Sequence, residues 1–437
     1  MGRPTCVDLF AGAGGLSLGF EQAGFDVVAA VEVDPVHAAV HKYNFPQCTV
    51  LPKSVVGLTG REIRRAAKLG NRRIDVVVGG APCQGFSLIG QRALDDPRNS
   101  LVREFVRIVA ELNASYFVFE NVKGLTVGKQ RGFLEEIIAA FNAVGYNIRT
   151  PWRVLNASEY GVPQDRQRLI LFGAKKTIRL PDYPSPITSR TGNNVALPPT
   201  PSCRQAIGDL PDAELFSELN SKDHVSGVKL GRPSAYAISM RCARAGDWHW
   251  GYRRDWDPSL LTSSARTDHT PISRRRFRET EQGEVELISR FFKLSGDGVC
   301  NTLRAGTDAS RGAFTSPRPI HYDKPRCITV REMARLHGFP DWFRLHATKW
   351  HGARQIGNAV PPPLAREVGM QVMRALGCKP TRPRSALALG DAKLLILDLS
   401  QASEYWDVAN PISRRDKKSG AKKRKQRDIE AAMFAGL

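Results

Sequence analysis

The sequence predicts an α/β fold, in which a doubly wound, mostly parallel sheet is accompanied by a second, smaller domain of irregular or β-rich structure. Short apolar runs rich in β-branched residues are typical of strands buried on both faces, and amphipathic segments alternate with them. These runs are residues 5–10, 27–31, 74–78, 116–119 and 169–173. The alternation stops between residues 177 and 322, where prolines cluster, and this change indicates the second domain.

The composition is that of a globular protein and favours a polyanionic partner. Its 437 residues allow two or three domains, and its net charge of +21 favours nucleic acid as that partner. No apolar run is long enough to span a bilayer and no signal peptide precedes the first strand, so we expect a cytoplasmic protein without a membrane partner. The eight cysteines lack metal-binding spacing, so we expect reduced thiols and no metal site.

A glycine-rich turn joins the first strand to the first predicted helix. The turn spans Gly12 to Gly15, the helix is expected to end at Gly24, and Glu32 stands at the end of the second strand. Such a turn lets a ligand approach the helix N-terminus, and the carboxylate can hold both hydroxyls of a ribose. A nicotinamide dinucleotide is an alternative ligand, but the third glycine of its fingerprint is missing, which favours a nucleoside without a pyrophosphate.

A single cysteine follows the buried strand at residues 74–78. Two glycines allow the chain to turn there, and Pro82 fixes the backbone just before Cys83. A lone thiol displayed where a buried strand meets a loop is well placed to act as a nucleophile. The alternative is that Cys83 is one more small, buried apolar residue. The polar stretch at residues 90–99 shows no apolar periodicity and is expected to be a loop beside it.

Charged residues flank two further strands of the predicted sheet. Glu120 follows the strand at residues 116–119, and in a parallel sheet the carboxyl ends of the strands form the ligand crevice. Arg166 and Arg168 precede the strand at residues 169–173 and alternate, so both can face one side. The alternatives are a helix cap or surface charge at Glu120 and an edge strand with solvated arginines.

The remainder of the chain carries basic and aromatic residues in several short pieces. Residues 248–256, 274–278 and 301–306 interleave them in a way that suits contacts to phosphates and bases. A capping box at Thr329 and Glu332 predicts a helix that ends before Gly338. Another helix is predicted over about residues 361–376, and a basic, disordered tail is expected at the C-terminus.

Six motifs, in this order, resemble the cytosine-C5 DNA methyltransferase family, in particular its prokaryotic, restriction-modification type. They are residues 8–15 (DLFAGAGG), 80–84 (GAPCQ), 120–122 (ENV), 164–168 (QDRQR), 331–340 (REMARLHGFP) and 355–360 (QIGNAV). The resemblance implies the fold of the S-adenosylmethionine-dependent methyltransferases and four regions. These are a catalytic and cofactor-binding domain (1–176), a target-recognition domain (177–322), a return segment (323–378) whose last helix completes the catalytic domain, and a C-terminal extension (379–437).

The resemblance also implies the site residues and their roles. S-adenosylmethionine would be bound by Phe10, Ala11, Gly12, Gly14, Gly15, Leu16, Glu32, Val33, Ser54, Pro82, Leu101, Asn358 and Val360. The catalytic residues would be Cys83, Glu120, Arg166 and Arg168, and the DNA-binding residues Gln84, Ser87, Arg98, Arg275 and Arg304. One position departs from the family pattern: Ser54 stands where members often place an aspartate that meets the adenine amino group.

The implied reaction is methylation of C5 of a flipped-out cytosine in a short, specific site of double-stranded DNA. Cys83 would add to C6, and Glu120 would protonate N3, which requires a raised pKa. We expect a monomer near the nucleoid, with a possible cognate restriction endonuclease. Three alternatives are a silent DNA-binding relative, an amino-group methyltransferase and the RNA-directed branch. The presence of the catalytic residues disfavours the silent relative, and the absence of a Pro-Pro-aromatic tetrapeptide disfavours the amino-group methyltransferase. The long variable region disfavours the RNA-directed branch.

Overall fold

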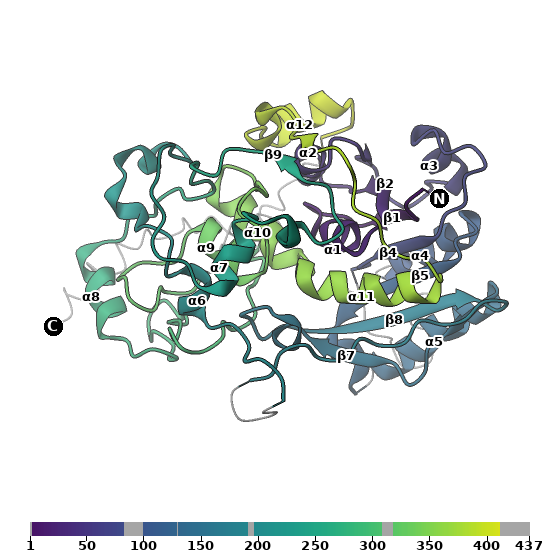
Figure 1. Ribbon diagram of the computed structural model, residues 1–437, viewed down its shortest axis with the longest axis horizontal. Helices are drawn as coiled ribbons and strands as arrows, with labels where there is room; N and C mark the ends of the chain where they lie inside the picture. Colours follow the sequence, from purple (N-terminus) through teal and green to yellow (C-terminus); the bar gives the residue numbers. More distant parts are fainter. Residues whose placement is uncertain (1, 83–98, 129, 191–195, 308–317, 411–437) are drawn as a thin grey trace, which may run out of the picture.

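The computed structural model describes residues 2–82, 99–128, 130–190, 196–307 and 318–410 (Figure 1). Its main feature is an eight-stranded sheet with the order β3-β2-β1-β4-β5-β8-β6, in which β7 also pairs with β8. The strands are β1 (Thr5–Leu9), β2 (Asp26–Val31), β3 (Thr49–Leu51), β4 (Val76–Gly79), β5 (Tyr116–Val122), β6 (Tyr146–Ile148), β7 (Arg153–Asn156) and β8 (Gln167–Lys175). This mostly parallel α/β sheet confirms the predicted fold class.

Strands β1 to β5 run parallel to their neighbours, whereas β8 is antiparallel to β5, β6 and β7. Pairing with β8 continues to the partners Val122 and Arg168, so β5 is longer than the sequence predicted. Glu120 therefore lies inside the strand rather than just past its end. The reversed direction of β8 brings its first residues to the edge of the sheet where the parallel strands end.

Helices cover both faces of the sheet. Together with helices that lie away from the sheet, the described ranges contain α1 (Gly15–Ala23), α2 (Pro35–Asn44), α3 (Gly60–Ala66), α4 (Ser100–Glu111), α5 (Gln130–Ala143), α6 (Cys203–Ile207), α7 (Ala235–Met240), α8 (Pro271–Glu279), α9 (Val330–Leu336), α10 (Lys349–Asn358), α11 (Pro362–Ala375) and α12 (Leu399–Trp406). Val76 and Val78 of β4 belong to one apolar cluster and Val77 to the other, as the two-residue period of a strand requires. The sheet is therefore buried on both faces.

Residues 177–190, 196–307 and 318–322 form mostly irregular structure with short helices. The two-residue strand β9 (Arg254–Asp255) pairs with β10 (Leu387–Ala388) from near the other end of the chain. Apolar side chains of this region, including Cys203 and Leu294, belong to the same cluster as those on the α1 face of the sheet. The irregular alternative of the prediction is thus observed, and a separate target-recognition domain stays a prediction.

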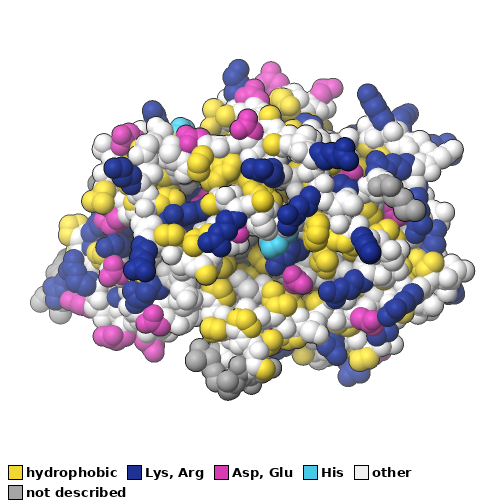
Figure 2. All heavy atoms as spheres, viewed as in Figure 1, with side chains coloured by type: hydrophobic (Ala, Val, Ile, Leu, Met, Phe, Trp, Pro, Cys, Tyr) yellow, Lys and Arg dark blue, Asp and Glu magenta, His cyan; other side chains and the backbone are white. Residues whose placement is uncertain are grey.

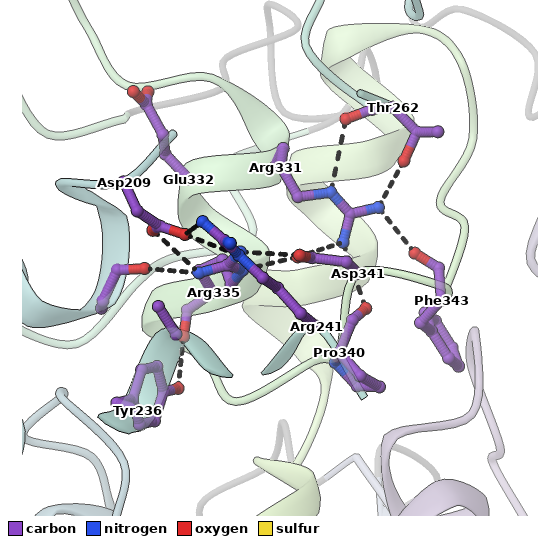
Figure 3. Close-up of polar contacts among 12 residues, drawn as sticks. Asp209, Tyr236, Arg241, Thr262, Arg331, Glu332, Arg335, Pro340, Asp341 and Phe343 are labelled. Atoms are coloured by element: carbon purple, nitrogen blue, oxygen red, sulfur yellow. Dashed lines mark hydrogen bonds and ion pairs between the residues drawn. The ribbon is translucent and has the colours of Figure 1, made fainter. Parts of the chain in front are cut away.

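Helix α9 is held by buried arginines that the sequence analysis did not single out (Figure 3). The predicted capping box is present, since Thr329 accepts from the Glu332 amide and the Glu332 carboxylate accepts from the Thr329 amide. Arg335 is fully buried and donates to both oxygens of Asp341 and to Asp209. These bonds join the return segment to the irregular region.

Two C-terminal helices return to the N-terminal part of the chain. Helix α11 packs along α1, where Gly19 allows so close an approach that an added Cβ would lie 2.3 Å from the Cβ of Ala365. Helix α12 and the short 3-10 helix η9 (Ala392–Leu395) pack against α2 (Figure 1). The predicted basic tail lies outside the described residues. No helix in the described ranges is long and apolar enough to cross a membrane.

Candidate active site

A cavity of about 1110 Å³ opens at the edge of the sheet where β1, β2, β4 and β5 end. This volume is at the upper end of that of ligand pockets, which is roughly 300 to 1,000 Å³. Fifteen of the residues predicted from the sequence line it: Phe10, Ala11, Gly12, Gly15, Leu16, Glu32, Val33, Ser54, Pro82, Leu101, Glu120, Arg166, Arg168, Asn358 and Val360. The structure therefore brings together residues that span most of the chain.

The glycine turn forms one wall of this cavity. Gly12 and Gly14 adopt left-handed backbone angles, with φ of 54° and 107°. Gly14 faces the protein interior, because an added Cβ would lie 2.4 Å from the ring of Phe45. At Gly15 an added Cβ would lie 2.5 Å from the carbonyl oxygen of Val360. The turn is thus in close contact with the segment that leads into α11.

Glu32 lies next to this turn at the end of β2. Its Oε2 accepts a hydrogen bond of 2.8 Å from the amide of Gly12, and its Oε1 accepts one of 2.9 Å from the amide of Asp34. Burial raises the pKa of this carboxyl, although these amides and the nearby His37 lower it. Each oxygen uses one lone pair in these bonds, so the carboxylate can accept further hydrogen bonds from a ligand in the cavity.

Glu120 and Arg168 form an ion pair on adjacent strands. The Nε atom of Arg168 lies 2.8 Å from Oε1 of Glu120, and both side chains are almost buried. An added Cβ at Gly80 would lie 2.4 Å from Oε2 of Glu120, so the space for this carboxyl depends on a glycine at that position. Burial raises the pKa of Glu120, whereas the two arginines Arg168 and Arg166 lower it. The net direction is upward, which favours a carboxyl that can donate a proton.

Arg166 is also buried but makes a different set of contacts. Its guanidinium donates to the carbonyl oxygens of Leu303 at 3.0 Å, Gly357 at 2.7 Å and Ala359 at 2.9 Å. These carbonyls belong to two segments that line the cavity. The contacts indicate a positioning residue that holds these segments together, and the predicted catalytic role of Arg166 stays a prediction.

Further residues line the cavity without having been predicted. They include Asp34 and His37 on or before α2, Trp350, His351 and Arg354 on α10, and Leu399 on α12. Asp34 and His37 lie two and five positions after Glu32, so their closeness to that residue was a usable signal. Those of α10 lie on the turns before the motif at 355–360. No local pattern around Leu399 indicates that it reaches this cavity.

The remaining predicted residues are separate from the cavity or outside the described structure. Cys83, Gln84, Ser87 and Arg98 lie outside the described residues. Arg275 is on α8, where its exposed side chain pairs with Glu279 at 2.8 Å. Arg304 precedes Ala305 and Gly306, which line the cavity. In the described ranges no cluster of His, Cys, Asp and Glu could hold a metal ion.

Comparisons with known proteins match most of this chain. The sequence profile of the family described as C-5 cytosine-specific DNA methylase matches residues 4–374. The type II methyltransferase M.XorII of Xanthomonas oryzae pv. oryzae is 59% identical over 415 residues, which cover 95% of each chain. M1.HphI of Haemophilus parahaemolyticus, also a type II methyltransferase, is 34% identical and covers 85% of this chain and 87% of its own.

A solved structure shows the same similarity in three dimensions. It is the crystal structure of a prophage-encoded protein of E. coli described as a DNA modification methyltransferase. Its TM-score is 0.69 at 33% identity, and the match covers 86% of this chain and 99% of the other. The S. pombe Dnmt2 methyltransferase, with a TM-score of 0.51 and 16% identity, shares the fold.

Proposed function

This chain belongs to the C-5 cytosine-specific DNA methylase family, and we propose that it transfers the methyl group of S-adenosylmethionine to C5 of a cytosine in a short, specific site of duplex DNA. The observation that carries this proposal is that Glu32 and Glu120 line the same cavity. One carboxyl is suited to a ribose, and the other, paired with Arg168 and raised in pKa, is suited to a base.

The residues around the glycine turn fit S-adenosylmethionine. Gly12 leaves the backbone open before α1, Glu32 has free lone pairs for the ribose hydroxyls, and Val33 is exposed beside it. Pro82, Leu101, Asn358 and Val360 would enclose the rest. Ser54 lines the cavity and offers a hydroxyl in place of a carboxylate to the adenine amino group. The sulfonium of this cofactor supplies the methyl group.

The proposed mechanism makes C5 nucleophilic before methyl transfer. The thiolate of Cys83 adds to C6, which forms the S–C6 bond, while Glu120 donates a proton to N3 and accepts from the exocyclic amine. Arg168 holds Glu120 and would lie near O2 of the base. After methyl transfer, the C5 proton would be lost to solvent, the Cys83 thiolate would leave C6, and N3 would return its proton to the Glu120 carboxylate, which restores the aromatic ring. Because Cys83 directly follows Pro82 at the cavity, only a base flipped out of the duplex could reach it.

Double-stranded DNA is the proposed partner of the basic surface. The net charge is +21, and Lys and Arg side chains are spread over the face shown in Figure 2. We propose that residues 177–322 read the target site and that Arg275 and Arg304 contact DNA, together with Gln84, Ser87 and Arg98. Type II relatives suggest a restriction endonuclease with the same site. We further propose a cytoplasmic, monomeric enzyme.

Transfer of tritium from methyl-labelled S-adenosylmethionine to plasmid DNA tests this function, and bisulfite sequencing of the product identifies the methylated cytosines. We expect label in DNA with the wild-type chain and none with Cys83→Ser, while that variant still binds target DNA. Full activity of Cys83→Ser would exclude the covalent mechanism. DNA binding by the wild type without any label transfer would instead favour a silent DNA-binding relative.

A further inference from the structure

The last helix in the described residues forms part of the cavity wall. Helix α12 begins at Leu399, which lies 25 residues beyond the end of the family profile match at residue 374. Leu399 nevertheless lines the same cavity as the glycine turn and Glu32, and its side chain is half-buried. The C-terminal extension therefore contributes a surface that the family match does not include.

Helix α12 is attached to the start of α2. The indole Nε1 of Trp406 donates a hydrogen bond of 3.1 Å to the carbonyl oxygen of Pro35, the first residue of α2. Ala402 and Ser403 are buried between them. Pro35 lies only three positions after Glu32, so this attachment places α12 directly beside the ribose-binding carboxyl of the proposed function.

The segment before α12 is fixed by a second set of contacts. The ring Nε2 of His346 lies 3.0 Å from the carbonyl oxygen of Leu397, and the amide of Ala347 donates to Leu395 at 2.9 Å. The amide of Gly390 donates to the carbonyl oxygen of Tyr43 at 2.9 Å, at the far end of α2. The extension is thus bound at both ends of α2 and next to α10. Its position is set by packing and hydrogen bonds along its length.

Three helices meet at this part of the wall, and together they bring an apolar side chain and two imidazole rings to it. His37 of α2, His351 of α10 and Leu399 of α12 all line the cavity. Within the described structure, Nε2 of His37 and Nδ1 of His351 are buried and make no hydrogen bond. Burial lowers the pKa of His351 to about 3, so its ring is neutral at pH 7. The neutral ring of His351 beside the apolar side chain of Leu399 suits an uncharged ligand group.

We propose that α12 belongs to the cofactor subsite, where Leu399 contacts the nucleoside end of bound S-adenosylmethionine. This inference rests on the proposed function, because it assumes that the cofactor occupies the Glu32 end of the cavity. It assigns to the C-terminal extension a direct part in cofactor affinity.

Calorimetric titration of the full-length protein with S-adenosylhomocysteine, the product form of the cofactor, tests this assignment. Leu399→Ala removes apolar contact area and should raise the Kd about three- to tenfold. Tyr405→Ala is the matched control, because Tyr405 is on the same helix and 54% exposed, and its Kd should equal that of the wild type. Equal Kd values for Leu399→Ala and wild type would overturn the proposal.

Hydrogen exchange on the wild-type chain provides a second measurement that needs no variant. Addition of S-adenosylhomocysteine should slow exchange of the amides in α12, whereas α8 should be unaffected. Unchanged exchange in α12 at saturating ligand would also overturn the proposal. Failure of the wild type to bind this ligand at all would contradict the proposed function instead, so the two failures are distinguishable.

Discussion

Arg168 contacts Glu120 across two antiparallel strands, with 2.8 Å between Nε of the arginine and Oε1 of the glutamate. This guanidinium has two opposing consequences for the carboxyl. It fixes the orientation of Glu120 in the cavity, and it lowers a pKa that burial raises. The net upward direction favours the protonated form of Glu120, which the proposed role as a proton donor to a cytosine ring requires.

Replacement of Arg168 should shift the pH dependence of methyl transfer. If protonated Glu120 is the active form, the rate falls as pH rises through its pKa. Arg168→Met removes the positive charge that stabilises the carboxylate, so this pKa rises further and the alkaline limb of the kcat–pH profile moves to higher pH. The value of kcat itself should fall by about 10- to 1,000-fold, because the orientation of Glu120 is lost.

Single-turnover rates at saturating cofactor and DNA, measured from pH 6 to pH 9, would define the alkaline limb of the pH profile for each variant. Arg131→Met is a suitable control, because Arg131 is exposed on α5, pairs with the exposed Glu135 at 3.6 Å and has no proposed role in binding or catalysis. Its profile should match that of the wild type. An alkaline limb that moves to lower pH in Arg168→Met would show that Glu120 acts in its ionised form.

Asp8 carries a buried carboxyl beneath the glycine turn. Its Oδ2 accepts a hydrogen bond of 2.6 Å from Ser17, which in turn lies 3.0 Å from His41, and Oδ1 has no partner within the described structure. Burial raises the pKa of Asp8 from 3.8 to about 7. The folded state therefore holds a proton that the unfolded state releases above pH 4, so this group lowers stability as pH rises from about 4 to 7.

The stability of Asp8→Asn relative to that of the wild type should accordingly increase as the pH rises. Relative to the wild type, its free energy of unfolding should grow by about 2 to 3 kcal/mol between pH 5 and pH 8, with no further change above that. Urea denaturation at four pH values checks this. Asp257→Asn, at an exposed carboxyl whose pKa Ser259 lowers, should show no such gain. A difference for Asp8→Asn that is independent of pH would contradict the assignment.

Local patterns in the sequence predicted the elements around the cofactor end of the site. The left-handed Gly24 is present at the predicted end of α1, because a turn glycine depends only on nearby backbone groups. Glu32 follows a strand whose alternating residues pack on opposite faces of the sheet. These features require no knowledge of distant contacts.

Features that depend on distant partners were not predicted from the sequence. The direction of β8 is set by which strands it joins, and hydrophobic pattern is the same for either direction. Arg335 lies in a helix where a charged residue is usually exposed, and its burial depends on Asp209, more than a hundred positions away. The capping box of α12, from Asp398 and Gln401, can be recognised in the sequence, but no local pattern indicates that this helix contacts α2.

Removal of the Arg335 guanidinium should strongly destabilise the fold (Figure 3). Arg335→Met leaves the buried Asp341 carboxylate with only a weak ion pair of 3.9 Å to Arg331 among its described neighbours. Loss of one partner of a buried pair costs about 3 to 5 kcal/mol, because the other charge stays desolvated. Urea unfolding measures this change. The double variant Arg335→Met/Asp341→Asn should recover part of the loss, and a larger loss would contradict this account.

The contact between α1 and α11 should be sensitive to added side-chain volume. Gly19→Ala would place a methyl group 2.3 Å from the Cβ of Ala365 and 2.7 Å from the amide nitrogen of Arg366, so α11 must shift. Overpacking of this kind costs about 1 to 3 kcal/mol. Because α11 follows Val360, which contacts Gly15 in the cofactor cavity, the shift should also weaken cofactor binding.

Gly132→Ala provides the matched control for this variant. Gly132 lies in α5, where an added Cβ meets no atom within 4 Å, so alanine should stabilise the helix by about 0.5 to 1 kcal/mol. Thermal unfolding should therefore move in opposite directions for the two glycines, and only Gly19→Ala should raise the Kd for S-adenosylhomocysteine. If Gly19→Ala lowered stability without changing this Kd, the α1–α11 contact would support the fold alone and would not position the cofactor wall at Val360.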